Sequence, residues 1–236
     1  MNPFNQASNL TFSDWKTIDD ELAGCRRCAR LVACRETVAR EKKKAYRDQE
    51  YWGKPVPGFG DREGRVAVVG LAPGAHGSNR TGRMFTGDAS GDFLYPALHR
   101  AGFASQPEAV SRGDGLTLSD LYIIAVCRCA PPDNKPERGE MEACRPFLED
   151  ELALMHRLQG IVCLGRIAFE RVSLLYRALG ASTVDWNFEH AGFIQNGGGL
   201  PWVLNSYHPS RQNTQTGRLN VEMFTAVWTK ARSLLG

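Results

Sequence analysis

Cysteine is the residue type in this chain that most directly suggests chemistry, and seven cysteines are present. Cys25 and Cys28 form a CxxC motif, while Cys129 and Cys144 lie far downstream, beside a proline-rich stretch. Four thiolates from two separated pairs suit either zinc or an iron-sulfur cluster, and spacing alone does not decide between them. A second CxxC would be typical of structural zinc, and here the second pair is 15 positions apart.

The other cysteines are weaker candidates. Cys127 competes with Cys129 as the third ligand, because residues two apart in a strand face the same side. Cys129 is preferred since two prolines follow it closely, which places it where a strand ends. Cys163 lies inside an apolar run and is expected in the core. Cys34 is expected to be a buried thiol, with a spare ligand as the alternative. A thioredoxin-type dithiol at the CxxC is disfavoured because no strand precedes it.

Three polar or glycine-rich loops carry the remaining candidates for chemistry. Residues 70–88 are rich in glycine, which lets the backbone approach a ligand closely. This stretch matches neither GxGxxG nor GxxxxGK[ST], so it predicts neither a dinucleotide fold nor a P-loop. Residues 129–136 contain three prolines, and residues 207–214 begin with Tyr-His-Pro-Ser.

The elements that must position these loops can be read from four short, continuous apolar runs, 66–70, 121–126, 161–164 and 202–205. Continuous β-branched and aliphatic runs are typical of parallel strands buried on both faces, so we expect an α/β layered fold. The segments between these runs and after the last one predict helices over 91–101, 139–158, 166–179 and 219–234. In such sheets the chemistry lies in loops that follow the carboxyl ends of the strands.

Length and charge describe one ordinary globular domain of 236 residues, which we divide into an N-terminal segment, 1–60, and a core, 61–236. The N-terminus has no signal-peptide pattern and no apolar run reaches 18 residues, which predicts a cytoplasmic protein without a membrane segment. Nine basic residues lie between positions 26 and 47. They indicate either a polyanion contact or a simple solvated helix face. They are Arg26, Arg27, Arg30, Arg35, Arg40, Lys42, Lys43, Lys44 and Arg47.

Four motifs occur together in one order: GLAPGAHGSNRTGRMFTGD, CRCAPPDNKPERGEMEAC, VCLGR and YHPSRQNTQTGRL. In this combination they resemble the uracil-DNA glycosylase superfamily, and more narrowly its type B members, the fifth family, over roughly residues 20–232. The resemblance implies a three-layer fold with a central four-stranded parallel sheet flanked by helices. It also implies excision of uracil from DNA in base excision repair, and a 4Fe-4S cluster held by Cys25, Cys28, Cys129 and Cys144.

The resemblance also implies roles for single residues. Phe85 would stack on the extruded base, and His208 would donate a hydrogen bond to the base carbonyl as it gains charge. Asn134 would hold a water beneath the anomeric carbon. Asp88 would stabilise charge or bind water, or instead cap the helix that begins near Gly91. Other branches of the superfamily carry a water-activating polar residue after the first strand, whereas 70–74 here reads GLAPG.

Small residues at Gly70, Ala72 and Ala75 would leave room at the pocket floor, so other deaminated bases such as hypoxanthine are expected substrates. The partner is then double-stranded DNA, with single-stranded DNA as a further substrate, bound by a monomer associated with the nucleoid. Residues expected to contact DNA are Asn79, Arg80, Arg83, Arg211, Gln212 and Asn213.

Two other functions compete with a monofunctional glycosylase. A non-catalytic iron-sulfur module that binds DNA or senses damage would not require the set Phe85, Asn134 and His208. A relative that traps the abasic product covalently would carry a basic, His-containing insertion near the glycine-rich loop, and this chain has none. Lyase activity is not expected: Lys135 is the one lysine in the four motifs, and no role in forming a Schiff base is implied for it.

Overall fold

A mixed sheet of six strands forms the centre of the computed structural model, which describes residues 3–4 and 10–236. The strand order is β1-β3-β2-β4-β6-β5. The four inner strands pair in parallel, and each edge strand pairs antiparallel with its neighbour. The strands are β1 (Phe59–Gly60), β2 (Val66–Gly70), β3 (Leu121–Ala125), β4 (Gly160–Leu164), β5 (Phe193–Ile194) and β6 (Trp202–Ser206).

The four inner strands coincide with the four apolar runs of the sequence, and every residue in them is buried. The expected four-stranded parallel sheet is nevertheless too simple. It omits β1 and β5, which have only two half-buried residues each and therefore no hydrophobic periodicity to reveal them.

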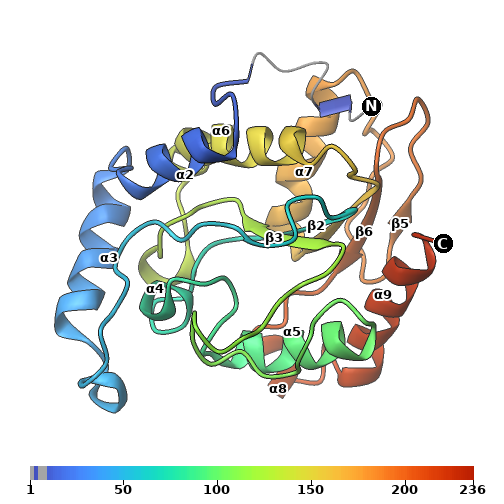
Figure 1. Cartoon of the computed structure of the whole chain (residues 1–236). Coiled ribbons are helices and arrows are strands. Elements are labelled where there is room, and N and C mark those ends of the chain that lie inside the picture. The colour runs from blue at the N-terminus through green and yellow to red at the C-terminus, as the bar shows by residue number, and fades with distance from the viewer. Residues whose placement is uncertain (1–2, 5–9) are drawn as a thin grey trace.

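Helices cover both faces of the sheet, which gives the three layers visible in Figure 1. All four predicted helices are present, with ends that agree to within four residues. The helices are α2 (Trp15–Ala23), α3 (Ala29–Glu41), α4 (Ser78–Thr81), α5 (Ala89–Arg100), α6 (Arg138–Leu154), α7 (Arg166–Ala178), α8 (Arg211–Gln215) and α9 (Val221–Ser233), with short 3-10 turns η1 (Lys44–Tyr46) and η2 (Pro132–Asn134).

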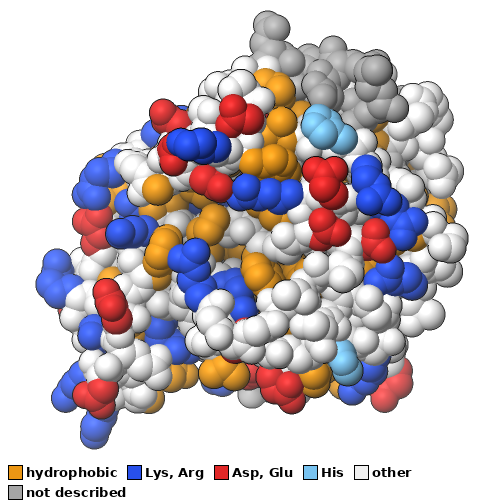
Figure 2. Space-filling model, in the orientation of Figure 1, with side chains coloured by type: hydrophobic (Ala, Val, Ile, Leu, Met, Phe, Trp, Pro, Cys, Tyr) orange, Lys and Arg blue, Asp and Glu red, His pale blue; other side chains and the backbone are white. Residues whose placement is uncertain are grey.

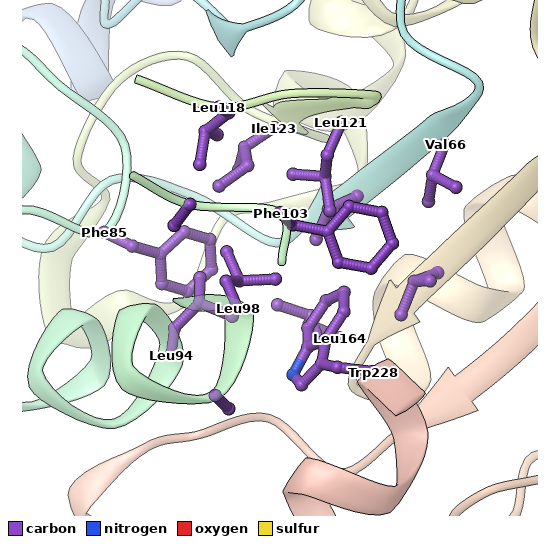
Figure 3. Close-up of a cluster of buried hydrophobic side chains, with 14 of the residues drawn as sticks. Val66, Phe85, Leu94, Leu98, Phe103, Leu118, Leu121, Ile123, Leu164 and Trp228 are labelled. Atoms are coloured by element: carbon purple, nitrogen blue, oxygen red, sulfur yellow. The ribbon is translucent and has the colours of Figure 1, made fainter. Parts of the chain in front are cut away.

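Each face of the sheet has its own apolar core, because successive side chains of a strand point to opposite faces. On β2, Val66 and Val68 join the core beneath α5 and α9, whereas Ala67 and Val69 join the core beneath α6 and α7. Figure 3 shows the first of these cores, with Trp228 of α9 packed against it. Packing on both faces holds the carboxyl ends of the strands in fixed positions.

The predicted N-terminal segment packs on the core in its described part, since α2 contacts α6 and α3 contacts α4. Residues 1–2 and 5–9 of that segment lie outside the described residues. The division between 1–60 and 61–236 stays a prediction. No helix in the described ranges has the length and apolar character needed to cross a membrane.

Candidate functional site

The three loops chosen from the sequence begin at the same edge of the sheet. The glycine-rich loop follows β2, the proline-rich loop follows β3, and the loop beginning at Tyr207 follows β6. These strands run parallel within one sheet, so their carboxyl ends lie on one side. This edge is the candidate functional site.

Phe85 and His208 meet at this site although they come from different loops. Their ring centroids are 5.8 Å apart, with an angle of 33° between the ring planes. Phe85 also packs against the core, and Figure 3 shows its ring at one end of the cluster, beside Leu94 and Leu98. The ring closely approaches Gly70, where an added Cβ would lie 3.1 Å from Phe85 Cζ. Core packing and ligand stacking are therefore compatible, because the core contacts hold the ring in place.

The backbone at Phe85 has an uncommon conformation. Its φ is +52°, a left-handed value that bulky residues rarely adopt. The Phe85 N–H donates to Ser78 Oγ over 3.0 Å, which helps to hold this turn. Backbone strain of this kind is concentrated at functional sites.

His208 is held in the site as a neutral imidazole. Burial lowers the pKa of His208 to about 4, so the ring carries one N–H donor and one acceptor at neutral pH. The side chain of Asn213 donates to the His208 carbonyl oxygen over 2.9 Å and fixes the loop. Within the described ranges, the ring nitrogens of His208 make no hydrogen bond, so they are available to a ligand.

Asp88 both caps a helix and faces the glycine-rich loop. Its Oδ1 accepts hydrogen bonds from Ser90 N, at 3.0 Å, and Gly91 N, at 3.1 Å, which caps α5. Its Oδ2 lies against the glycine-rich loop, where a Cβ added to Gly77 would be 1.8 Å away and one added to Gly74 would be 2.9 Å away. Burial raises the pKa of Asp88, while the two cap hydrogen bonds oppose that shift. The capping role is confirmed, and the second oxygen is left for another partner.

Asn134 lies in the turn η2 at the same edge of the sheet. Asp133 and Asn134 have φ values of +52° and +56°, and the Asn134 N–H donates to Pro131 O over 3.3 Å. The Asn134 side chain is exposed. Because the prolines restrict this turn, the amide group is presented toward solvent by a stiff loop.

Three of the expected DNA contacts have other partners inside the protein. Asn79 and Arg83 are buried; the Asn79 amide donates to Arg35 O over 3.2 Å, and Arg83 pairs with Asp114 through two hydrogen bonds of 2.6 and 2.7 Å. Arg80 is also buried and donates to backbone carbonyls of the glycine-rich loop. These side chains hold the loop in place through internal hydrogen bonds, so the prediction that they contact phosphates is wrong.

The expected contacts on α8 differ from one another. Arg211 and Gln212 are exposed at its first turn, where a ligand could reach them. Asn213 is half-buried and its side chain donates to the His208 carbonyl oxygen, so it holds the loop that carries His208.

One contact was not anticipated from the sequence. The Tyr51 hydroxyl lies 3.1 Å from His76 Nδ1 and accepts a hydrogen bond from Lys43 N over 3.3 Å. Burial lowers the pKa of His76, and the charges of Lys43 and Arg80 lower it further. Tyr51 stands in a turn-rich linker, where no pattern marks a single aromatic residue. The contact holds the turn after α3 beside the glycine-rich loop.

The basic stretch is partly neutralised. Arg26 pairs with Glu36, and Arg30 pairs with Glu140. In the described part of the chain, no carboxylate pairs with the four cations that follow α3, which we call the basic turn: Lys42, Lys43, Lys44 and Arg47. Figure 2 shows Lys and Arg side chains at the protruding corner below α3, with a few acidic side chains among them.

Cys25, Cys28, Cys129 and Cys144 line one small cavity, together with Arg128 and apolar side chains from α2, α3 and α6. Cys127 does not line it and is buried in the core beneath α6. No three His, Cys, Asp or Glu side chains of the described ranges are placed to bind one metal ion.

The thiols around this cavity differ in acidity. A hydrogen bond from Cys127 lowers the pKa of Cys144, and the nearby charge of Arg128 lowers it further. Burial raises the pKa of Cys129 to about 11, although Arg35 opposes this shift. Cys127 therefore acts as a donor toward Cys144.

The sequence is similar to known proteins over most of its length. Residues 57–232 match the family model described as the uracil DNA glycosylase superfamily. A type-5 uracil-DNA glycosylase of Thermus thermophilus is 52% identical, covering 91% of this chain and 95% of that protein. A type-5 uracil-DNA glycosylase of Pyrobaculum aerophilum is 44% identical, covering 92% of each chain. A type-4 uracil-DNA glycosylase of Archaeoglobus fulgidus is 29% identical over 76% of this chain.

The family match covers most of the chain, and the relatives align nearly end to end with it. The loops that bring Phe85 and His208 together lie within the matched region. The chain belongs to the uracil-DNA glycosylase superfamily.

Proposed function

We propose that the chain, acting as a monomer, excises uracil from DNA by hydrolysing the N-glycosidic bond and leaves an abasic site in base excision repair. The family match and the names of relatives at 44–52% identity support uracil excision itself. The observation that carries the reaction in this chain is the approach of Phe85 and His208 within 5.8 Å at the edge of the sheet.

Recognition of the base rests on these two rings. A glycosylase must extrude its nucleotide from the duplex and hold the free base in a pocket. Phe85, fixed by the core, offers an aromatic surface for stacking. His208, neutral at pH 7, donates its N–H to the base carbonyl oxygen that gains negative charge as the bond breaks.

Asp88 and Asn134 supply the groups for the sugar and the water. The Asp88 carboxylate can stabilise the positive charge that develops on the sugar, through the oxygen that the helix cap leaves unused. The Asn134 amide can orient a water but cannot remove its proton strongly. Because positioning and electrostatics supply much of the rate enhancement, the apolar stretch 70–74 does not prevent catalysis.

Release of uracil is tested by incubating the pure protein with a labelled duplex containing uracil and then cleaving abasic sites with alkali. We expect strand cleavage with the wild type and a loss of about 100-fold or more with His208→Ala. The second candidate, a module that binds DNA without catalysis, predicts no cleavage by either protein. Equal rates for His208→Ala and wild type would refute the proposed role of His208.

The substrate range extends to other deaminated bases. Gly70, Ala72 and Ala75 place no large side chain along the glycine-rich loop, and hypoxanthine is bulkier than uracil. Excision from duplexes that carry hypoxanthine in place of uracil tests this proposal, and the same oligonucleotides without a complement test activity on single-stranded DNA. Strict preference for uracil would contradict the wider range.

The basic turn contacts the DNA backbone beside the extruded nucleotide. Its cations lack carboxylate partners within the described residues, and Tyr51 ties the turn to His76 of the glycine-rich loop. Each phosphate contact contributes a slope of about −0.9 to the salt dependence of log affinity. Lys43→Gln should therefore reduce this slope by about one, whereas an unchanged slope would exclude the contact.

A 4Fe-4S cluster bound by Cys25, Cys28, Cys129 and Cys144 is the proposed cofactor. Three observations support the fit: the four side chains line one cavity, its other walls are mostly apolar, and Arg128 there has buried Nε and Nη1 atoms without an acceptor in the described ranges. Each iron of a cluster takes a single thiolate, so a cluster does not need three ligands gathered on one ion. When bound, such a cluster supplies a cross-link between distant segments of the chain and a site for one-electron transfer.

The cluster is tested by measuring iron and acid-labile sulfide in protein purified without oxygen. We expect four of each per chain in the wild type and a marked loss in Cys129→Ala, while Cys127→Ala should keep them. Loss in Cys127→Ala with retention in Cys129→Ala would exchange the assignment of the third ligand.

A further inference from the structure

Arg35 is buried beside the cavity that the four cysteines line, and neither DNA binding nor base excision uses it. We propose that Arg35 is a positioning residue for the four-cysteine centre: it hydrogen-bonds to the Cys129 sulfur and raises the reduction potential of the bound cluster. This inference rests on the proposed cluster.

One guanidinium reaches both halves of the proposed ligand set. Arg35 Nη1 lies 2.9 Å from Cys129 Sγ, and Nη2 donates to Cys25 O over 3.1 Å. Cys25 belongs to the CxxC segment and Cys129 to the loop after β3. Because the guanidinium is planar, its two nitrogens fix both contacts at once. Arg35 therefore sets the distance between the two segments that carry the cysteines.

Among the residues that the structure describes, the charge of Arg35 has no close carboxylate partner. Its side chain is only 3% exposed, and Glu36, its carboxylate neighbour at 3.9 Å, is 42% exposed and hydrogen-bonded to Arg26. A buried charge is costly unless it is paired. A thiolate at Cys129 would supply the missing negative charge, whereas a neutral thiol would not.

A second buried cation stands at the same cavity. Arg128 is fully buried and pairs with the buried Glu151, so their charges cancel. Arg35 lacks such a pairing in the described ranges and is left as a buried excess positive charge beside this cavity, while the exposed Arg27 adds another cation to the lining. In addition, the Arg35 Nε has no acceptor within the described ranges. Excess charge and unused donors both suit an anionic ligand, such as a cluster held by four thiolates.

A hydrogen bond to a ligand sulfur favours the reduced cluster. Reduction adds one negative charge, and a donor on the sulfur stabilises that charge more than it stabilises the oxidised form. Hydrogen bonds to charged groups typically change equilibria by tenfold or more. Loss of the Arg35 contact should therefore shift the equilibrium constant for reduction about tenfold, which is about 59 mV for a one-electron couple.

The experiment compares Arg35→Met, which keeps an apolar side chain but has neither charge nor donor, with Arg40→Met as control. Arg40 is on the same helix, but its side chain is 71% exposed and interacts with Thr37 and Glu41 at the surface. The midpoint potential is measured by redox titration of anaerobic protein, followed by electron paramagnetic resonance. A second measurement is the rate of iron release to a chelator.

We expect Arg35→Met to have a midpoint potential about 59 mV lower than wild type and to release iron several-fold faster, while Arg40→Met matches wild type. A folded Arg35→Met that retains no iron would also support the proposal. If Arg35→Met does not fold, Arg35→Gln decides, since it keeps polarity but lacks the charge, and a lower potential is again expected.

One result would contradict the role of Arg35, and a different result would contradict the cluster itself. If Arg35→Met or Arg35→Gln keeps full iron with the potential and release rate of the wild type, then Arg35 has no such role. If anaerobically purified wild type holds neither iron nor sulfide, then the proposed cluster itself is wrong. Iron analysis of the wild type therefore separates failure of the inference from failure of the cofactor assignment.

Discussion

Substitution of Gly77 by alanine tests whether the position of the Asp88 carboxylate matters for excision. Gly77 lies in the glycine-rich loop, and a Cβ there would be 1.8 Å from Asp88 Oδ2 and 2.5 Å from Asp88 Cγ. Real Cβ atoms essentially never approach another heavy atom closer than 3.0 Å. Alanine therefore forces the carboxylate, the loop, or both to move by about 1 Å.

The size of the effect follows from this displacement. Misplacement of a reacting group by about 1 Å can cost about 100-fold in rate, so we expect a loss of that order in the excision step. The same movement strains the cap of α5, where Asp88 Oδ1 binds Ser90 N and Gly91 N. Loss of a helix cap typically costs about 1 kcal/mol in the free energy of unfolding. Activity should thus fall much more than stability.

The assay is single-turnover excision from a uracil duplex, combined with urea denaturation of each variant. Gly74→Ala is a graded comparison, because its Cβ would lie 2.9 Å from the same oxygen, and its effect should be smaller. Gly113→Ala is the matched control, since an added Cβ there meets nothing within 4 Å. A wild-type excision rate for folded Gly77→Ala would refute the role assigned to Asp88.

Three further predictions concern other parts of the site. Burial holds the pKa of His208 at about 4 in the folded protein, below its usual 6.5. As the pH falls, this histidine therefore binds a proton in the unfolded chain before it does so in the folded one. The free energy of unfolding should then fall by up to about 3 kcal/mol from pH 6.5 to 4. His208→Gln should flatten this dependence in urea titrations, and an equally steep profile would contradict it. Arg83→Met removes the buried partner of the half-buried Asp114 and should cost about 2 kcal/mol in urea denaturation. The salt dependence of the affinity for DNA should not change in this variant. A reduced slope would instead show that Arg83 contacts a phosphate. Gly70→Ala places a Cβ 3.1 Å from Phe85 Cζ, so single-turnover excision should slow by about tenfold or less; no change would argue against base stacking there.

Much of the fold follows from local patterns. The four apolar runs became the four inner strands because a strand buried on both faces needs continuous apolar residues. The edge strands β1 and β5 could not be predicted, since a pair of residues becomes a strand only by pairing with a neighbour far along the chain. Helix ends also depend on contacts with residues far along the chain, so they were predicted less accurately than the strands.

Part of the site also followed from the sequence, and the rest only from the tertiary structure. The sequence by itself determined which loops follow the strands and hence that Phe85 and His208 lie at one edge of the sheet, because parallel strands share a direction. It did not determine that Arg83 forms an ion pair with Asp114. The tertiary structure decided that, because burial and charge pairing depend on residues that meet only when the layers pack. For the same reason, only the packed structure brought Arg35 to the Cys129 sulfur.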